Sequence, residues 1–180
     1  MNVIKIDNLN DIIETHPQFK KKSLAYDAVS AALDCTLTKA RELVATHCNM
    51  LSLYACIRAD EKYHGTYHQF FKLSYLNGFC NHKGYIGKNA SKDKPELLEF
   101  FSIKSSLTKY EDFEDIINPF RLNPDKFYQI KMKADTQGFH YISGYIQDDK
   151  FYCSCTSYRG TGWKAEKYLN ENNFVWAKEI

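Results

Sequence analysis

The stretch GFHYISGYIQDDKFYCSCTSYRGTG, residues 138–162, decides the fold class of this chain. Two sets of side chains alternate over residues 139–146, with aromatic residues and a serine in one set and isoleucines, a glycine and His140 in the other. This period of two predicts a β-strand, because successive side chains of a strand point to opposite faces. Residues 147–150 are typical of a turn, and residues 151–154 then return antiparallel. The stretch therefore predicts a β-hairpin that carries a histidine near its start.

Helical periodicity dominates the chain before this hairpin. Apolar side chains recur at helical spacing in four segments, residues 24–33, 36–44, 48–60 and 67–77. From residue 127 the spacing changes to two, and residues 174–178 are typical of an edge strand. Helices followed by antiparallel strands predict an α+β fold. We therefore expect a single domain over residues 1–180, in which a helical part (about 8–118) packs on an antiparallel sheet (about 127–180).

The charge balance bears on the class of partner. Twenty-four lysines and arginines nearly cancel 22 aspartates and glutamates, so the chain has no bulk attraction for nucleic acid. Two lysine clusters, at residues 20–22 and 88–94, are typical of solvated loops. The 13 tyrosines could stack on bases, but their positions in strands and helices place most of them in the core or at its rim. The sequence therefore favours a protein or peptide partner over nucleic acid.

Other features of the composition indicate the compartment. No apolar run approaches the ~18–20 residues of a membrane span, and the acidic residues near Met1 leave no room for the apolar core of a secretory signal. Six cysteines are present, but none forms a CxxC pair, so free thiols in a reducing compartment are expected. We therefore expect a cytoplasmic protein with no membrane partner and no cofactor.

A cysteine and a histidine could carry chemistry. A cysteine nucleophile needs a nearby histidine that holds it as a thiolate, and a third group that orients the imidazole ring. Cys48 opens the predicted helix 48–60, and His140 lies on the predicted hairpin. Alternatively, Cys48 is a small buried apolar residue and His140 a hydrogen-bonded structural residue of the strand.

Four segments together resemble a known family. They are LAYDAVSAALD (24–34), LTKARELV (37–44), GTYHQFFKLSYLNGF (65–79) and the hairpin GFHYISGYIQDDKFYCSCTSYRG (138–160). In their order and spacing, residues 23–163 resemble the small papain-like cysteine peptidase folds of phages, viruses and bacteria. That family carries its cysteine at the start of a helix and its histidine at the start of a late hairpin. The resemblance implies an α+β papain-like fold, and a phage or virus origin, one of the sources of this family, would place the chain in the host cytoplasm.

The resemblance allows two registers for the nucleophile. If residues 24–34 form the nucleophile helix, the cysteine position falls at Leu24, beside Ser23, and the chain is a pseudoenzyme because an alkyl group cannot attack a carbonyl. The second register places the nucleophile at Cys48 and retains a Cys48–His140 dyad. In either register the resemblance puts the orienting residue 14–16 positions after His140, where the chain has Ser154, Cys155 and Thr156. Ser154 or Thr156 would orient the ring more weakly than a carboxylate.

A third interpretation is structural zinc. His64 and His68 lie four residues apart, and Cys80 and His82 follow shortly after, which gives the four ligands that zinc requires. The Cys-x-His spacing is unusual for such a site. We therefore expect no metal, with a zinc-stabilised binding module as the last alternative. The first expectation is a catalytically degenerate binding protein, and the second an active thiol hydrolase with Cys48, His140 and Ser154 or Thr156.

Overall fold

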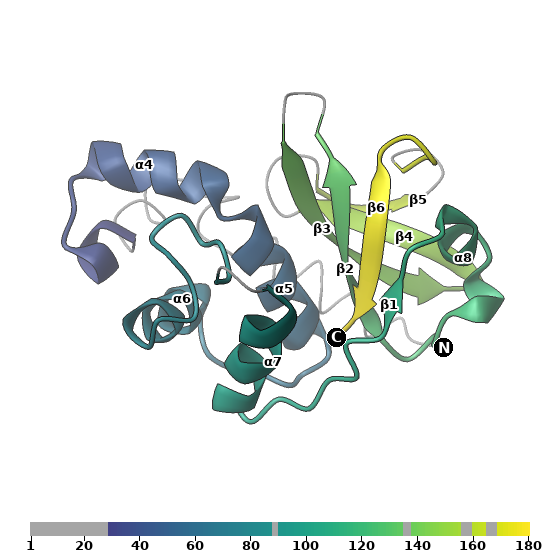
Figure 1. Ribbon diagram of the computed structural model, residues 1–180, viewed down its shortest axis with the longest axis horizontal. Helices are drawn as coiled ribbons and strands as arrows, with labels where there is room; N and C mark the ends of the chain where they lie inside the picture. Colours follow the sequence, from purple (N-terminus) through teal and green to yellow (C-terminus); the bar gives the residue numbers. More distant parts are fainter. Residues whose placement is uncertain (1–28, 88–89, 135–137, 156–159, 165–168) are drawn as a thin grey trace.

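A computed structural model describes residues 29–87, 90–134, 138–155, 160–164 and 169–180 of the chain. It is an α+β protein, as predicted, with its main helices on one side and an antiparallel sheet on the other (Figure 1). The helices are α4 (Leu37–Thr46), α5 (Cys48–Ala59), α6 (Tyr67–Leu76), α7 (Ala90–Phe100) and α8 (Phe113–Ile117), with a 3₁₀ turn η1 (Pro119–Arg121). No helix in the described ranges combines the length and the apolar character that crossing a lipid bilayer requires.

Helix α6 begins at a residue that satisfies free backbone groups. Thr66 caps α6: its hydroxyl accepts a hydrogen bond from the Gln69 backbone N–H, and the Gln69 side chain accepts one from the Thr66 backbone N–H. Pro95 lies inside α7, where it cannot donate a backbone hydrogen bond. The hydrogen bond that Pro95 cannot donate is offset by the burial of Leu97 and Leu98 next to it.

The sheet has six strands in the order β1-β6-β2-β3-β4-β5. They are β1 (Lys109–Tyr110), β2 (Phe127–Lys133), β3 (Phe139–Gln147), β4 (Lys150–Cys155), β5 (Gly160–Lys164) and β6 (Phe174–Glu179), and all neighbours are antiparallel. The expectation that residues 174–178 form an edge strand is wrong. The two residues of β1, which come from the predicted helical part, cover the outer side of β6.

The predicted hairpin is present as β3 and β4. Gln147 pairs with Lys150, so only Asp148 and Asp149 form the turn. Their φ angles are 48° and 54°, the left-handed values that a type I′ turn needs at both central positions. Aspartate tolerates this conformation better than most residues, which explains why the turn forms without glycine.

The two faces of the sheet have different coverings, and the strand register says which residue is on which face. Gln129 pairs with Ser143, and both contact α5; we call this side the helix face. Ile130 pairs with Ile142 on the opposite side, which we call the far face. Apolar side chains from α5, α6 and α7 pack with Phe127 on the helix face. The isoleucines belong to a separate apolar cluster on the far face, so the sheet stands between two cores.

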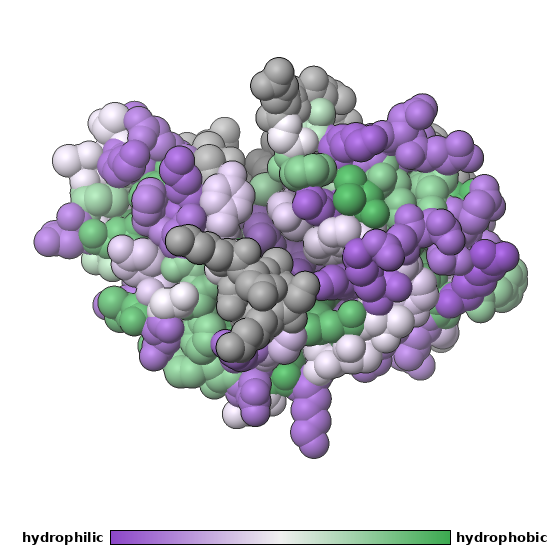
Figure 2. Space-filling model, viewed as in Figure 1, coloured by the Kyte–Doolittle hydropathy of each residue, from purple (hydrophilic) through white to green (hydrophobic). Residues whose placement is uncertain are grey.

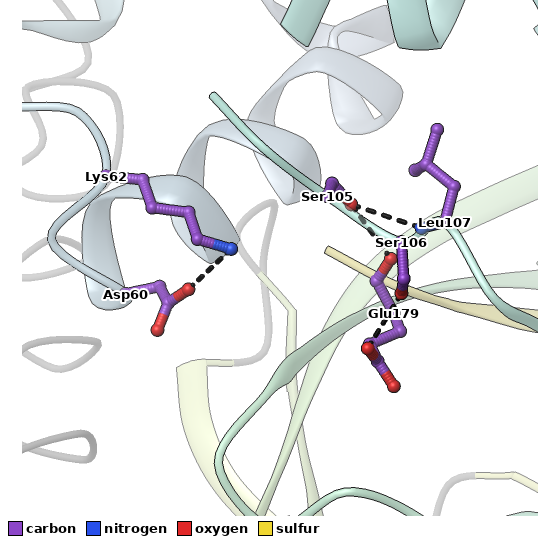
Figure 3. A network of polar contacts seen from close by, with 6 residues as sticks. All are labelled: Asp60, Lys62, Ser105, Ser106, Leu107 and Glu179. Carbon is purple, nitrogen blue, oxygen red and sulfur yellow. Dashed lines mark hydrogen bonds and ion pairs between the residues drawn. The ribbon is translucent and has the colours of Figure 1, made fainter. Parts of the chain in front are cut away.

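Polar contacts attach the segment before β1 to the C-terminal strand (Figure 3). The Ser106 hydroxyl donates a hydrogen bond of 2.7 Å to the carboxylate of Glu179, and the Ser105 hydroxyl donates one of 3.2 Å to the Glu179 backbone oxygen. These bonds hold β1 against β6. Figure 3 also shows the ion pair between Asp60 and Lys62, 2.8 Å long, which lies at the end of α5.

Candidate functional site

Cys48 is the first residue of α5 and is half-buried. The first turn of this helix contains no acidic residue, and the residue before it makes no side-chain capping bond. The side chain lies on the helix face, near Tyr141 of β3. The pKa of Tyr141 is raised, first by burial and second by the negative charge that an ionised Cys48 would bring close to it.

His140 lies on the far face. It pairs with Met132, a member of the far-face cluster, whereas Tyr141 next to it pairs with Lys131 on the helix face. Helix α5 contacts the sheet through residues of the helix face such as Ser143. The register therefore puts His140 and Cys48 on opposite sides of the sheet and does not favour the Cys48–His140 dyad, which stays a prediction. A strand shows only one side chain of each adjacent pair to a given helix.

The proposed orienting residues lie at the border of the described chain. The backbone of Ser154 pairs with that of Ser143 in the β3–β4 ladder. Thr156 lies outside the described residues, and so do Leu24 and Ser23 of the alternative register. The function of Ser154 and Thr156 as orienting groups for a histidine stays a prediction.

His47, which the sequence did not single out, has the best-defined surroundings of any histidine in the described chain. It is fully buried, and its Nδ1 lies 2.7 Å from the Tyr67 hydroxyl and its Nε2 3.2 Å from the backbone oxygen of His82. Because a carbonyl can only accept, Nε2 carries the hydrogen and Nδ1 accepts from Tyr67. Burial is the main cause that lowers the pKa of His47 to about 4. The ring is therefore neutral, with both nitrogens engaged.

The four residues suggested for zinc do not converge. In the described ranges, which include His64, His68, Cys80 and His82, no three His, Cys, Asp or Glu side chains lie close enough to hold a metal ion. Cys80 is buried and pairs with Ile86 in an isolated β-bridge. The backbone oxygen of His82, not its ring, contacts His47. The zinc-stabilised module therefore finds no site at these positions.

A buried polar network joins α5 to the sheet. The Gln129 amide donates hydrogen bonds of 2.8 Å to the Asn49 backbone oxygen and 2.8 Å to the Ser52 hydroxyl. The Ser143 hydroxyl donates one of 3.1 Å to the Ser52 backbone oxygen. All four residues are buried. Satisfied polar groups at this depth fix the register of the helix on the sheet, because any shift would leave them without partners.

Lys94 of α7 extends this network, although it belongs to a lysine cluster that predicted a solvated loop. Only 3% of the residue is exposed, and its ammonium donates a hydrogen bond to the side-chain oxygen of Gln129. It also lies 5.2 Å from the centre of the Trp176 ring. Burial, followed by repulsion from Lys178, lowers the pKa of Lys94 to about 7. The described chain provides no carboxylate partner for this lysine.

Beyond this network the helix face is lined by lysines and aromatic rings. We call it the lysine–aromatic face and define it by residues of β1, β6, β2 and β3: Lys109, Lys131, Lys133, Phe139, Tyr141, Trp176 and Lys178. Register places them in rows, since Trp176 pairs with Lys131 and Lys131 with Tyr141, while Lys178 pairs with Lys109. Sequence reasoning missed this face because its members come from four separate segments.

Acidic residues gather elsewhere, around α8. A pocket there is lined by Phe113 and Phe174 together with a set of charged residues, Glu111, Asp112, Glu114, Arg121 and Glu171. In Figure 2, hydrophilic residues cover much of the side of the molecule on which α8 and β1 lie in Figure 1. Four acidic residues and one arginine thus line this pocket, whereas the strand positions of the lysine–aromatic face carry lysines.

These positions fit binding better than covalent chemistry. Cys48 faces Tyr141 and not a histidine, while the buried cysteine of α5, Cys56, has its pKa raised to about 12 by burial. The lysine–aromatic face offers positive charge and exposed ring surface to a ligand.

Comparison of the chain with protein-family models, with curated proteins and with solved structures finds no match.

Proposed function

We propose that this chain is a binding protein that has a papain-like arrangement of helix and sheet but does not perform thiol hydrolysis. The observation that carries the proposal is the register of β2 and β3, which puts His140 beside Met132 and away from α5. A general base must come within hydrogen-bond reach of the proton that it removes. With the sheet between them, His140 would not come within that reach of Cys48.

The residue that faces the start of α5 cannot replace the histidine. Tyr141 stands on the helix face, and burial raises its pKa above the ordinary value of 10.0. A phenol that holds its proton at neutral pH cannot act as a general base there. A cysteine at a helix start next to a strand is compatible with the proposed papain-like arrangement, but no base stands opposite it on the helix face.

His47 does not supply the base from the other side. It precedes Cys48 in the chain, but Tyr67 and the His82 backbone oxygen occupy its two ring nitrogens. Burial holds its pKa near 4, so it binds a proton poorly at neutral pH. Its surroundings are those of a structural histidine that joins α5, α6 and the loop before α7.

The reactivity of Cys48 tests the proposal. The purified chain would be alkylated with iodoacetamide at pH 6, and the rate at Cys48 would be followed by peptide mapping. We expect a rate no faster than that of a cysteine in an unfolded peptide, because only a thiolate reacts rapidly. We also expect equal rates in the wild type, in His140→Ala and in the control His64→Ala, which removes an exposed histidine.

Active thiol hydrolysis, the alternative, predicts a different pattern. Cys48 would then react much faster than a free thiol at pH 6, and His140→Ala alone would abolish the excess. That result, together with cleavage of a peptide library that Cys48→Ser cannot perform, would overturn the proposal.

A further inference from the structure

The lysine–aromatic face lacks acidic residues that could neutralise its lysines. Four lysines occupy helix-face positions on β1, β6 and β2, and the described strand residues that share these positions include no aspartate or glutamate. Lys109 has a partner at the edge, the exposed Glu111. Lys131 and Lys178 contact rings instead, at 3.7 Å from the centre of Phe139 and 5.4 Å from that of Trp176. The central lysines therefore remain available to an external anion.

These lysines repel one another. Burial, and then the charge of Lys109, lowers the pKa of both Lys131 and Lys178. The charge of Lys178 likewise lowers the pKa of Lys94, after the larger effect of burial. A bound anion would reverse this repulsion, because it favours the protonated form of every lysine around it. Repulsion between these lysines therefore disfavours their charged forms, and a negatively charged ligand would reduce this repulsion.

The rings of the face offer a second kind of contact. Phe139 is 54% exposed at the start of β3, so its ring is accessible to a ligand. Tyr141 and Trp176, each partly exposed, meet edge to face with ring centres 6.0 Å apart. Flat rings next to lysines on an antiparallel sheet make a surface on which unpaired bases can stack while phosphates contact the ammonium groups.

We propose that the lysine–aromatic face binds single-stranded nucleic acid, with Lys131 and Lys178 on the phosphates and Phe139 stacked on a base. The inference rests on the proposed binding function and names the ligand class of that function. A duplex would leave the rings unused, since its bases are already stacked, and an acidic peptide would use only the lysines. The start of α5 near Tyr141 adds the positive end of a helix dipole at the border of the face.

This inference revises the expectation that nucleic acid is not a partner. That expectation used the net charge of +2, which averages the whole surface. The ligand meets one face only, and four of the acidic residues that enter the sum line a pocket around α8 instead. Local charge governs binding at a surface, because exposed charges beyond about 10 Å are screened at ordinary salt concentrations.

The test measures binding of the full chain to fluorescein-labelled oligonucleotides by fluorescence anisotropy. Single-stranded DNA and RNA of 20 nucleotides and the matching duplex would be titrated at several salt concentrations. We expect either single strand to bind more tightly than the duplex. With Lys131 and Lys178 on phosphates, the logarithm of the binding constant should fall with the logarithm of salt concentration with a slope of about −1.4.

Matched variants locate the binding. Lys131→Gln and Lys178→Gln should each weaken binding severalfold and make the salt slope less negative by about 0.7. Phe139→Ala should weaken binding roughly tenfold with an unchanged slope, because it removes stacking and no charge. The control Lys150→Gln removes the same charge at the exposed hairpin turn and should change neither quantity. Phe139 is exposed, so its replacement leaves the fold intact.

Three results would overturn the inference. They are no binding of either single strand at low salt, equal losses in Lys150→Gln and Lys131→Gln, and displacement of the oligonucleotide by poly-glutamate or inorganic phosphate at comparable charge concentration. Tight poly-glutamate binding that needs Lys131 would identify an acidic protein as the partner and leave the binding function in place. A separate measurement tests the proposed binding function: fast alkylation of Cys48 that depends on His140 would contradict it.

Discussion

The two faces of the sheet are formed by alternating residues of the same strands, but one face is packed with apolar side chains and the other with a polar network. On the far face, Ile130 and Ile142 pair inside an apolar cluster, and both are fully buried. On the helix face, Gln129 is equally buried but hydrogen-bonds to α5 and accepts from Lys94. Burial of apolar area stabilises the fold at about 25 cal/mol per Å², whereas a buried polar network contributes little net free energy and fixes geometry.

The contrast concerns stability: the helix face buries polar and charged groups where the far face buries apolar ones. A buried lysine without a carboxylate partner costs stability, and the far face shows that this chain can make an ordinary apolar core. We attribute the cost on the helix face to the proposed binding function. Lys94 lies beneath Trp176 and beside Lys178, so it adds positive charge under the lysine–aromatic face.

Removing the buried charge should give the largest effect. The pKa of Lys94 falls from 10.5 to about 7 on folding, so between these values the unfolded chain holds a proton that the folded chain has released. The unfolding free energy of the wild type should therefore rise with pH, by about 1.4 kcal/mol per unit and about 4 to 5 kcal/mol over the full window. Lys94→Met should remove this rise, as measured by urea unfolding from pH 6 to pH 9.

The control for this prediction is Lys150→Met, which alters an exposed lysine and should keep the wild-type pH dependence. Ionisation of cysteines and tyrosines in the unfolded chain contributes equally to all three proteins, so it cancels in the comparison. Parallel curves for wild type and Lys94→Met would mean that Lys94 keeps an ordinary pKa and that the helix face is not buried as described.

A packing substitution on the far face should have the next largest effect. A Cβ atom added to Gly144 would lie 2.4 Å from the Phe151 ring and 2.8 Å from Cδ1 of Ile130. Gly144→Ala should therefore lower the unfolding free energy by about 2 to 3 kcal/mol through overpacking. The control Gly78→Ala has open space around it but a φ of 77°, and should cost only about 1 kcal/mol of backbone strain. Equal losses, measured by urea unfolding, would contradict tight packing of the far face.

A pair of adjacent substitutions compares the faces directly and should give the smallest effects. Gln129→Leu leaves the Lys94 ammonium without its hydrogen-bond acceptor and should cost about 2 kcal/mol. Ile130→Val removes one methylene from the far face and should cost about 1 kcal/mol. Thermal unfolding at pH 6, where Lys94 is charged, should widen the difference between the two variants. A Gln129→Leu protein as stable as the wild type would show that the hydrogen bonds of the network do not contribute to the free energy of unfolding.

The α+β class and the hairpin could be predicted because their signals are local. Alternation over residues 139–146 and two aspartates in a tight turn need no information from elsewhere in the chain. The same alternation also shows that His140 and Tyr141 point in opposite directions. It cannot show which of them meets α5, because that choice is made by contacts such as Ser143 with Ser52, which lie 91 residues apart. Sequence reasoning could therefore not tell whether His140 lies on the same side of the sheet as Cys48.

Burial of charge was the other feature that local patterns could not reveal. Lys94 stands in a polar, lysine-rich segment that predicts solvent exposure, and only the packing of α7 against Gln129 buries it. The lysine–aromatic face likewise needs the strand order, since β6 and β1 bring Trp176, Lys178 and Lys109 next to β2. Strand order depends on long-range pairing, and one sequence alone contains no direct signal of it.

The central claim is that Cys48 faces position 141 and that the sheet separates it from position 140. Crosslinking of Cys48 with a short bismaleimide, in His140→Cys and in Tyr141→Cys, tests this claim directly, with the linked peptides identified by mass spectrometry. We predict a link from Cys48 to position 141 and none to position 140. A link from Cys48 to position 140, with none to position 141, would contradict the register and restore the possibility of a catalytic dyad.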